Sequence, residues 1–160
     1  MSNVCVLLDT SFFIRLLNPA DALHESAKEY YRYFLENDFV LKISTIAIAE
    51  FCVKGSVSML PMRNLQVLPF NFDHGVKAGE LCEIAFRKKT ERGAVFPQRT
   101  IVPNDTKMFA QAEIESDVNY FVSADSEANK VYNMIGEEYK FHFDYIDISI
   151  PYTRRFAILF

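Results

Sequence analysis

The chain has 160 residues, of which 50% are hydrophobic and 24% charged, and its formal net charge is −4. This length and composition are typical of one globular domain with a sizeable core, so we expect a single domain over residues 1–160. The negative charge argues against a broad basic surface for duplex DNA. It does not argue against a nucleic-acid enzyme whose carboxylates bind cations.

The sequence favours a cytoplasmic protein. No apolar run is long enough to cross a bilayer, and the N-terminus lacks the basic and apolar segments of an export signal. The three cysteines, Cys5, Cys52 and Cys82, are widely spaced in apolar surroundings. We therefore expect buried free thiols in a reducing compartment rather than a disulfide framework or a zinc site.

Hydrophobic periodicity predicts strands that alternate with helices. The expected strands cover residues 4–8, 39–43, 65–70, 120–123 and 145–150. The expected helices cover residues 10–17, 22–37, 46–53, 73–87 and 105–116, with a further one capped by Asp125 or Ser126. This alternation predicts an α/β fold with a mostly parallel central sheet between layers of helices. Residues 88–103 read as a long loop, and the tail 151–160 as an edge strand, a segment packed on the domain or a partner contact.

The most informative stretch is 4–11, VCVLLDTS, in which an apolar run leads into an acid and two hydroxyls. Such a run fits a strand buried on both faces, which puts Asp9 at the carboxyl edge of the sheet, where open α/β folds bind ligands. Asp125 follows another predicted strand, and Asp105 stands at the start of a predicted helix. For each of the three, helix capping and a catalytic role remain open alternatives.

Glu50 is the only charged residue within Ile46–Val53, and its helical neighbours are apolar. The pattern predicts a carboxylate that faces the core, which is costly unless it is paired or bound to a metal. The alternatives are an exposed position or a buried Glu–Arg pair. If this acid meets the three aspartates, like charges about 4 Å apart repel by roughly 4 kcal/mol per pair. A divalent cation reverses that repulsion, and oxygen ligands without His or Cys suit Mg²⁺ or Mn²⁺.

Four short motifs follow one another along the chain: VLLDTS with Asp9, AEF with Glu50, ND with Asp105 and FVSAD with Asp125. Their order and spacing, from residue 4 to about 149, resemble the PIN-domain ribonucleases. A bare domain of this kind is similar to the VapC-like toxins. The resemblance implies a PIN-like three-layer sandwich and a Mg²⁺- or Mn²⁺-dependent endoribonuclease, with the four acids as catalytic and metal-binding residues.

The resemblance also implies RNA as the substrate, cleavage to 5′-phosphate and 3′-hydroxyl ends, a small antitoxin protein as partner and a homodimer. Two departures from the family pattern stand out. Ser123 occupies a position that is often Thr, and the chain is longer than compact toxins through residues 88–103 and the tail. A non-toxin PIN-like RNA-processing nuclease and a catalytically silent PIN-like binding module are the alternative functions.

Polar and basic residues near the acids complete the expected site. The hydroxyls of Thr10, Ser11 and Ser123 are expected to orient water or phosphate. A group of cations precedes Asp105 and is expected to hold RNA phosphates: Arg87, Lys88, Lys89, Arg92 and Arg99. A solvated charged loop is an equally open interpretation of that group.

Overall fold

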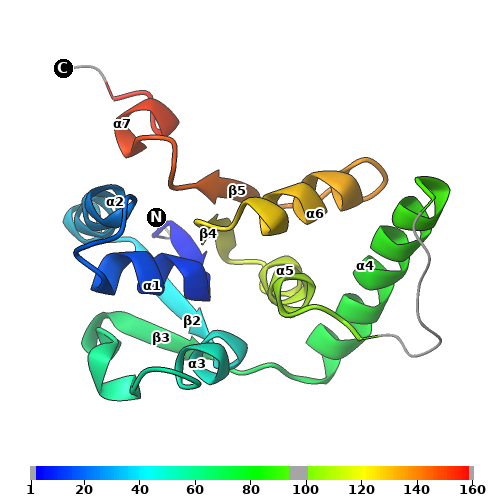
Figure 1. Cartoon of the computed structure of the whole chain (residues 1–160), viewed down its shortest axis with the longest axis horizontal. Coiled ribbons are helices and arrows are strands. Elements are labelled where there is room, and N and C mark those ends of the chain that lie inside the picture. The colour runs from blue at the N-terminus through cyan, green and yellow to red at the C-terminus, as the bar shows by residue number, and fades with distance from the viewer. Residues whose placement is uncertain (1–2, 94–100, 159–160) are drawn as a thin grey trace.

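The computed structural model describes residues 3–93 and 101–158 and contains a parallel sheet with helices on both sides (Figure 1). The strands of this sheet lie in the order β3-β2-β1-β4-β5, and every neighbouring pair is parallel. They are β1 (Cys5–Leu8), β2 (Val40–Ser44), β3 (Leu65–Leu68), β4 (Val118–Ser123) and β5 (Asp144–Asp147). The predicted α/β class and parallel sheet are confirmed.

The helices form two groups around the sheet. Helices α1 and α2 pack together, and α4, α5 and α6 contact one another. Their bounds are α1 (Thr10–Leu17), α2 (His24–Glu36), α3 (Thr45–Phe51), α4 (Phe72–Glu91), α5 (Asn104–Ile114), α6 (Ser126–Gly136) and α7 (Tyr152–Arg155), with short 3₁₀ turns η1 (Val57–Met59) and η2 (Met62–Asn64). Among the described residues, no helix is both long and apolar enough to span a membrane.

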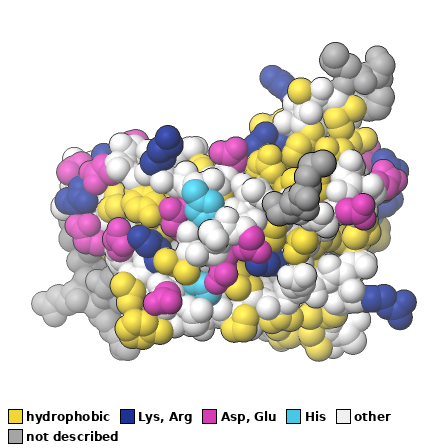
Figure 2. Space-filling view, turned by 180° about the vertical axis from the view of Figure 1, so that it is seen from behind, with side chains coloured by type: hydrophobic (Ala, Val, Ile, Leu, Met, Phe, Trp, Pro, Cys, Tyr) yellow, Lys and Arg dark blue, Asp and Glu magenta, His cyan; other side chains and the backbone are white. Residues whose placement is uncertain are grey.

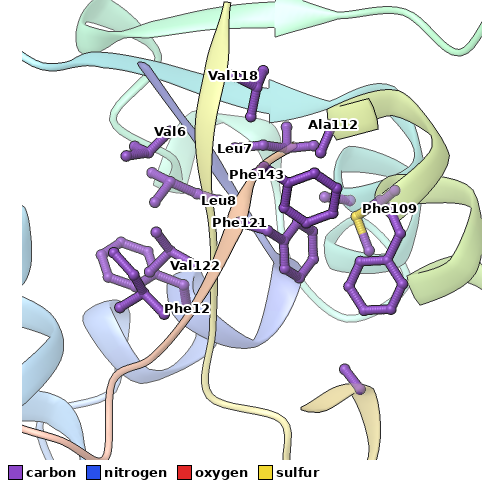
Figure 3. Packing of buried hydrophobic residues seen from close by; sticks show 14 of the residues in the cluster. Val6, Leu7, Leu8, Phe12, Phe109, Ala112, Val118, Phe121, Val122 and Phe143 are labelled. Carbon is purple, nitrogen blue, oxygen red and sulfur yellow. The ribbon is translucent and has the colours of Figure 1, made fainter. Parts of the chain in front are cut away.

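Strand β1 is buried along its whole length, as its continuous apolar sequence predicts. Successive side chains of a strand point to opposite faces of the sheet. Figure 3 accordingly shows Val6 and Leu8 on the side of Phe12 in α1, and Leu7 on the side of Phe109 in α5. Because both faces are covered by helices, no position of β1 needs a polar side chain until the strand ends.

The strand order reverses between β1 and β4. The chain moves outward from β1 to β2 and β3, and then returns to place β4 on the other side of β1. In open α/β sheets, the point where the order reverses leaves a crevice at the carboxyl ends of the strands, and ligands bind there. In this protein the crevice lies between residue 9, after β1, and residue 125, after β4.

Helix α4 differs from the prediction at both ends. Its N-cap is Asn71, whose side chain accepts a hydrogen bond from the His74 N–H while the His74 ring accepts one from the Asn71 N–H. This reciprocal capping box starts the helix ahead of Asp73. The helix then continues to Glu91, so residues 88–91 are helical rather than part of a loop.

Two other predictions need correction. Helix α2 begins at His24 rather than at residue 22, because Asp21 accepts a hydrogen bond from the Leu23 N–H in a preceding turn and pairs with Arg15. The thiols of Cys5 and Cys82 are buried as expected, but Cys52 is exposed.

The C-terminal tail packs on the domain. Residues 148–150, predicted to extend the last strand, lie after β5, and α7 follows them. The Phe156 ring stacks on Tyr33 of α2 with centroids 4.7 Å apart, and Tyr152 contacts Tyr30 edge-on. Aromatic pairs of this kind contribute about 0.5–1.5 kcal/mol each beyond the burial of their area. The tail therefore covers α2, and of its three possible roles the packed one is observed.

Candidate functional site

The four predicted acids line one cavity of about 420 Å³ at the carboxyl edge of the sheet. Asp9 follows β1, Asp125 lies just after β4, Glu50 belongs to α3 and Asp105 to α5. Residues separated by more than a hundred positions in sequence thus reach one site because parallel strands end at a common edge. We call this site the acid cavity.

Asp9 is the buried member of the acid cavity, with 6% of its surface exposed. Its Oδ1 accepts a hydrogen bond from the Thr10 N–H (2.8 Å), and its Oδ2 accepts from the hydroxyls of Ser11 (2.7 Å) and Ser123 (2.8 Å). Burial raises the pKa of Asp9; these hydrogen bonds oppose that shift, and the nearby charge of Glu50 adds to it. No ion pair joins Asp9 to a cation of the described residues. The hydrogen bonds therefore orient the carboxylate, but no positive side chain neutralises its charge.

The three predicted hydroxyls each contact an acid of the cavity. Besides binding Asp9, the Ser11 oxygen accepts the Ala124 N–H, and the Ser123 oxygen accepts the Asp125 N–H. These bonds tie the end of β1 to the turn after β4. The Thr10 hydroxyl donates to Oε1 of Glu50 at 2.9 Å, which links α1 to α3.

The two remaining aspartates differ in how the backbone holds them. Asp125 is the N-cap of α6 and accepts the Glu127 N–H. Asp105 lies in the first turn of α5, after the N-cap Pro103, and accepts the Thr106 N–H at 2.7 Å. Burial raises the pKa of Asp105, and the charge of Asp125 adds to the shift. Capping and lining the acid cavity are therefore compatible, since Asp9 and Asp125 do both.

Glu50 does not face the core, contrary to the prediction. Its side chain is exposed, and Ala47 is the only fully buried residue of α3. Since α3 is a short helix beside the cavity, the face that carries Glu50 opens into the cavity instead of being covered. Within residues 3–93 and 101–158, Glu50 forms no ion pair, so the Glu–Arg alternative is also wrong there.

Tyr145 contacts the backbone of a site residue, and the sequence did not indicate this contact. It lies on β5, beside Phe121 of β4, and its hydroxyl donates to the carbonyl oxygen of Asp125 at 3.0 Å. Burial raises the pKa of Tyr145 above its usual value. The contact depends on the pairing of β4 with β5, and no local sequence signal reports it.

Most of the predicted phosphate-binding cations are paired with two acids that directly follow α6. Arg87 contacts Glu138 at 2.6 Å, Arg92 contacts Glu137 at 2.7 Å, and Lys88 lies within 3.4 Å of both acids. We call these contacts the α4–α6 ion pairs. They reduce the positive charge that these three side chains present to a ligand.

Two members of the predicted group stand apart. Lys89 forms no ion pair within the described ranges, and its charge lowers the pKa of Asp105 against the effect of burial. Arg99 lies outside the residues that the structure describes. On the face seen in Figure 2, acidic and basic side chains are interspersed, and no broad basic patch gathers there.

The acid cavity suits a divalent cation that keeps part of its water shell. It is not a complete cage of protein ligands. Across residues 3–93 and 101–158, no group of three or more His, Cys, Asp or Glu side chains is arranged to hold a metal ion by itself. The described wall nevertheless contains four carboxylates and neither Lys nor Arg, and the buried Asp9 lacks a cationic partner. Mg²⁺ typically binds through one or two carboxylates and keeps several waters. The residues therefore fit a hard divalent cation.

No protein-family model and no curated protein matches the sequence. Among solved structures, the VapBC2 complex of Rickettsia felis bound to a promoter DNA fragment matches with a TM-score of 0.58 and 17% identity, over 90% of this chain and 98% of that chain. The DNA-bound VapBC of Salmonella typhimurium matches with the same score and identity over 91% and 98%. The toxin VapC20 of Mycobacterium tuberculosis, described as cleaving the sarcin–ricin loop, matches with a TM-score of 0.52 and 20% identity over 78% and 93%. The chain has the PIN-domain fold of VapC proteins.

Proposed function

We propose that this protein is a metal-dependent endoribonuclease that hydrolyses RNA phosphodiester bonds, and that it is the toxin of a type II toxin–antitoxin pair. The observation that carries the proposal is the acid cavity, where four carboxylates meet at the switch point of the sheet around an un-neutralised Asp9. Structures of VapC proteins with the same fold, one of them a toxin that cleaves an RNA loop, support RNA as the substrate.

In this proposal Asp9, Glu50, Asp105 and Asp125 are the catalytic and metal-binding residues. Bound Mg²⁺ or Mn²⁺ supplies the activation of water and the stabilisation of charge on the phosphodiester. Asp9 directs its carboxylate into the cavity, because three donors hold the group in one orientation. Each of the other three acids comes from a different element and faces the same space.

The hydroxyls act on the acids rather than on the substrate. Thr10 orients Glu50 through its hydrogen bond to Oε1. Ser11 and Ser123 restrain Asp9 and at the same time hold the backbone of the turn that carries Asp125. This network keeps the ligand oxygens in place in the free protein, which lowers the ordering cost of cation binding.

The partners follow from the same resemblance. The matching structures from Rickettsia felis and Salmonella typhimurium are VapBC complexes. We therefore propose a small antitoxin as partner of this chain, together with a homodimer. Expression of the wild-type chain should arrest bacterial growth, and expression of the Asp9→Asn variant should not; arrest by both would contradict the toxin assignment.

The test of the chemistry is cleavage of single-stranded RNA with Mg²⁺, with Mn²⁺ and with EDTA. Asp9→Asn should reduce cleavage by about 10²-fold or more, since removing mere supporting groups of a metal site already costs 10–100-fold. The matched control is Asp147→Asn, because Asp147 also ends a strand of the sheet but does not line the acid cavity. Undiminished cleavage by Asp9→Asn, or in EDTA, would refute the metal mechanism.

Cation binding has a second readout that does not depend on activity. A ligand that binds only the folded state at 100 times its Kd stabilises a protein by about 2.7 kcal/mol. Mg²⁺ or Mn²⁺ should therefore raise the unfolding midpoint of the wild type and of Asp147→Asn. The same cation should raise the midpoint of Asp9→Asn much less. An equal rise in all three proteins would show that the cation binds elsewhere.

A further inference from the structure

In the described part of the chain, the cations without an acidic partner are fewer than the paired ones, and they identify where a polyanion can bind. Most Lys and Arg side chains form ion pairs, including the α4–α6 ion pairs. Within residues 3–93 and 101–158, the ones that form none are Lys54, Arg63, Lys89, Lys107, Lys140 and Arg154. An unpaired cation gives up less when a phosphate approaches, because no existing partner has to be displaced.

Lys54 borders the acid cavity from the side of α3. It lines a groove of about 660 Å³ that shares Thr10, Ile14 and Glu50 with the acid cavity, so the two spaces are adjacent. The groove is mainly apolar, and Leu17 belongs to its wall. A cation at the rim of an apolar groove suits a nucleotide of a single strand, whose base exposes an apolar face next to its phosphate.

Lys89 and Lys107 belong to the helices α4 and α5, which pack against each other, and α5 also carries Asp105 of the acid cavity. Lys89 lies in the last turn of α4 and forms no ion pair within residues 3–93 and 101–158. Lys107 lies on α5 and donates to the side chain of Asn104, three residues before it, at 3.4 Å; Asn104 itself lines the cavity. The three lysines thus come from three segments around one site, although none of them belongs to the cavity wall.

This arrangement solves an electrostatic problem of the site. The four carboxylates repel the phosphates of an RNA strand, and the bound cation compensates for that repulsion only near the reacting phosphodiester. Cations just outside the wall hold the neighbouring phosphates without pairing with the acids themselves. Arg87, Lys88 and Arg92 would first have to break their ion pairs with Glu137 and Glu138, so binding a phosphate would cost them more free energy.

We infer that Lys54, Lys89 and Lys107 bind the phosphate backbone of a single-stranded RNA that crosses the acid cavity, with Lys54 on one side and the two other lysines on the α4–α5 side. The inference rests on the proposed ribonuclease function and assigns its substrate path. Of the cations predicted from sequence, it retains Lys89 and replaces the paired ones with Lys54 and Lys107.

The experiment measures the anisotropy of a fluorescein-labelled single-stranded RNA of mixed sequence, titrated with Asp9→Asn protein, which should not cleave it, at several salt concentrations. Lys54→Ala, Lys89→Ala and Lys107→Ala are each added to that background. Each lysine that contacts a phosphate should lower the slope of log Kd against log salt by about 0.7 and weaken binding by about fivefold at 0.1 M salt.

Two controls carry the same loss of charge. Lys88→Ala removes the helical neighbour of Lys89, which is paired with Glu137 and Glu138. Lys140→Ala removes an unpaired lysine that lines a separate cavity beside α6 and shares no lining residue with the acid cavity. Both should change RNA affinity by less than any of the three inferred contacts does.

The outcomes separate this inference from the proposed function. In proteins with Asp9 intact, the three lysine variants should raise KM for RNA cleavage and leave kcat nearly unchanged. If the wild type cuts RNA but the three variants bind like the controls, or if no binding is measurable at low salt, the substrate path is wrong and the nuclease stands. If the wild type cuts no RNA yet binding depends on the three lysines, the path stands and the chemistry is wrong.

Discussion

Two charged regions of this protein differ in whether their charges are paired. In the acid cavity, carboxylates from four elements meet, and none of the described residues of the wall is Lys or Arg. In the α4–α6 ion pairs, three cations of α4 and its C-cap meet the acids Glu137 and Glu138 at the surface. A net charge of −4 for the whole chain conceals this separation of paired from unpaired charge.

The comparison shows that the two regions carry different costs. Exposed ion pairs contribute little to stability, because solvent screens them and two long side chains must be ordered. The buried Asp9 works against stability, since its raised pKa means that the folded state disfavours its charge. Unfavourable electrostatics that the fold nevertheless maintains mark a functional site, and the acid cavity meets that description.

Ser123→Ala should have the largest effect on stability. Ser123 is fully buried, donates to the charged Asp9 and accepts the Asp125 N–H, so the substitution removes one of the three donors to a buried carboxylate and the acceptor of a backbone N–H. The expected loss is about 1–3 kcal/mol in the free energy of unfolding, measured by urea denaturation. Ser126→Ala is the control, because Ser126 is exposed on α6. Equal losses in both variants would mean that the hydroxyl network is not what holds Asp9.

The second-largest effect is expected in the pH dependence of stability. Because burial raises the pKa of Asp9 in the folded state, the native protein binds more protons than the unfolded chain between the unfolded value of 3.8 and the raised native value. The loss of stability caused by the charged, buried Asp9 is complete above the native pKa. It disappears as the pH falls through this window. In EDTA, the wild type should therefore gain stability relative to Asp9→Asn on acidification. A pH-independent difference between the two proteins would contradict a raised pKa.

The double substitution Glu137→Gln and Glu138→Gln should have the smallest effect. It breaks the α4–α6 ion pairs, which lie at the surface, so the unfolding midpoint should change little and the change should vanish at high salt. Because neither acid lines the acid cavity, kcat for RNA cleavage should be unaffected. A loss of cleavage comparable to that of Asp9→Asn would show that the two regions are not independent.

The sequence by itself determined the order of strands and helices and the set of acids at the site. The apolar run of β1 predicts a strand covered on both faces, and a parallel sheet brings the residues that follow its strands to one edge. That reasoning predicts Asp9 and Asp125 at one edge, the resemblance to PIN domains adds Asp105, and all three line the acid cavity. It also indicated the hydroxyls of Ser11, the second residue of α1, and of Ser123, the last residue of β4.

Only the tertiary structure decided which charges are paired and which faces are covered. The pattern of α3 shows apolar neighbours around Glu50 but not whether another element covers them, and the structure leaves that side chain exposed. The charge of Arg92 is visible in the sequence, but its partner Glu137 lies 45 positions away on another element. The hydroxyl of Tyr145 reaches Asp125 only because β5 pairs with β4. Periodicity is a local property of the chain, whereas pairing and burial depend on contacts between segments that are distant in sequence.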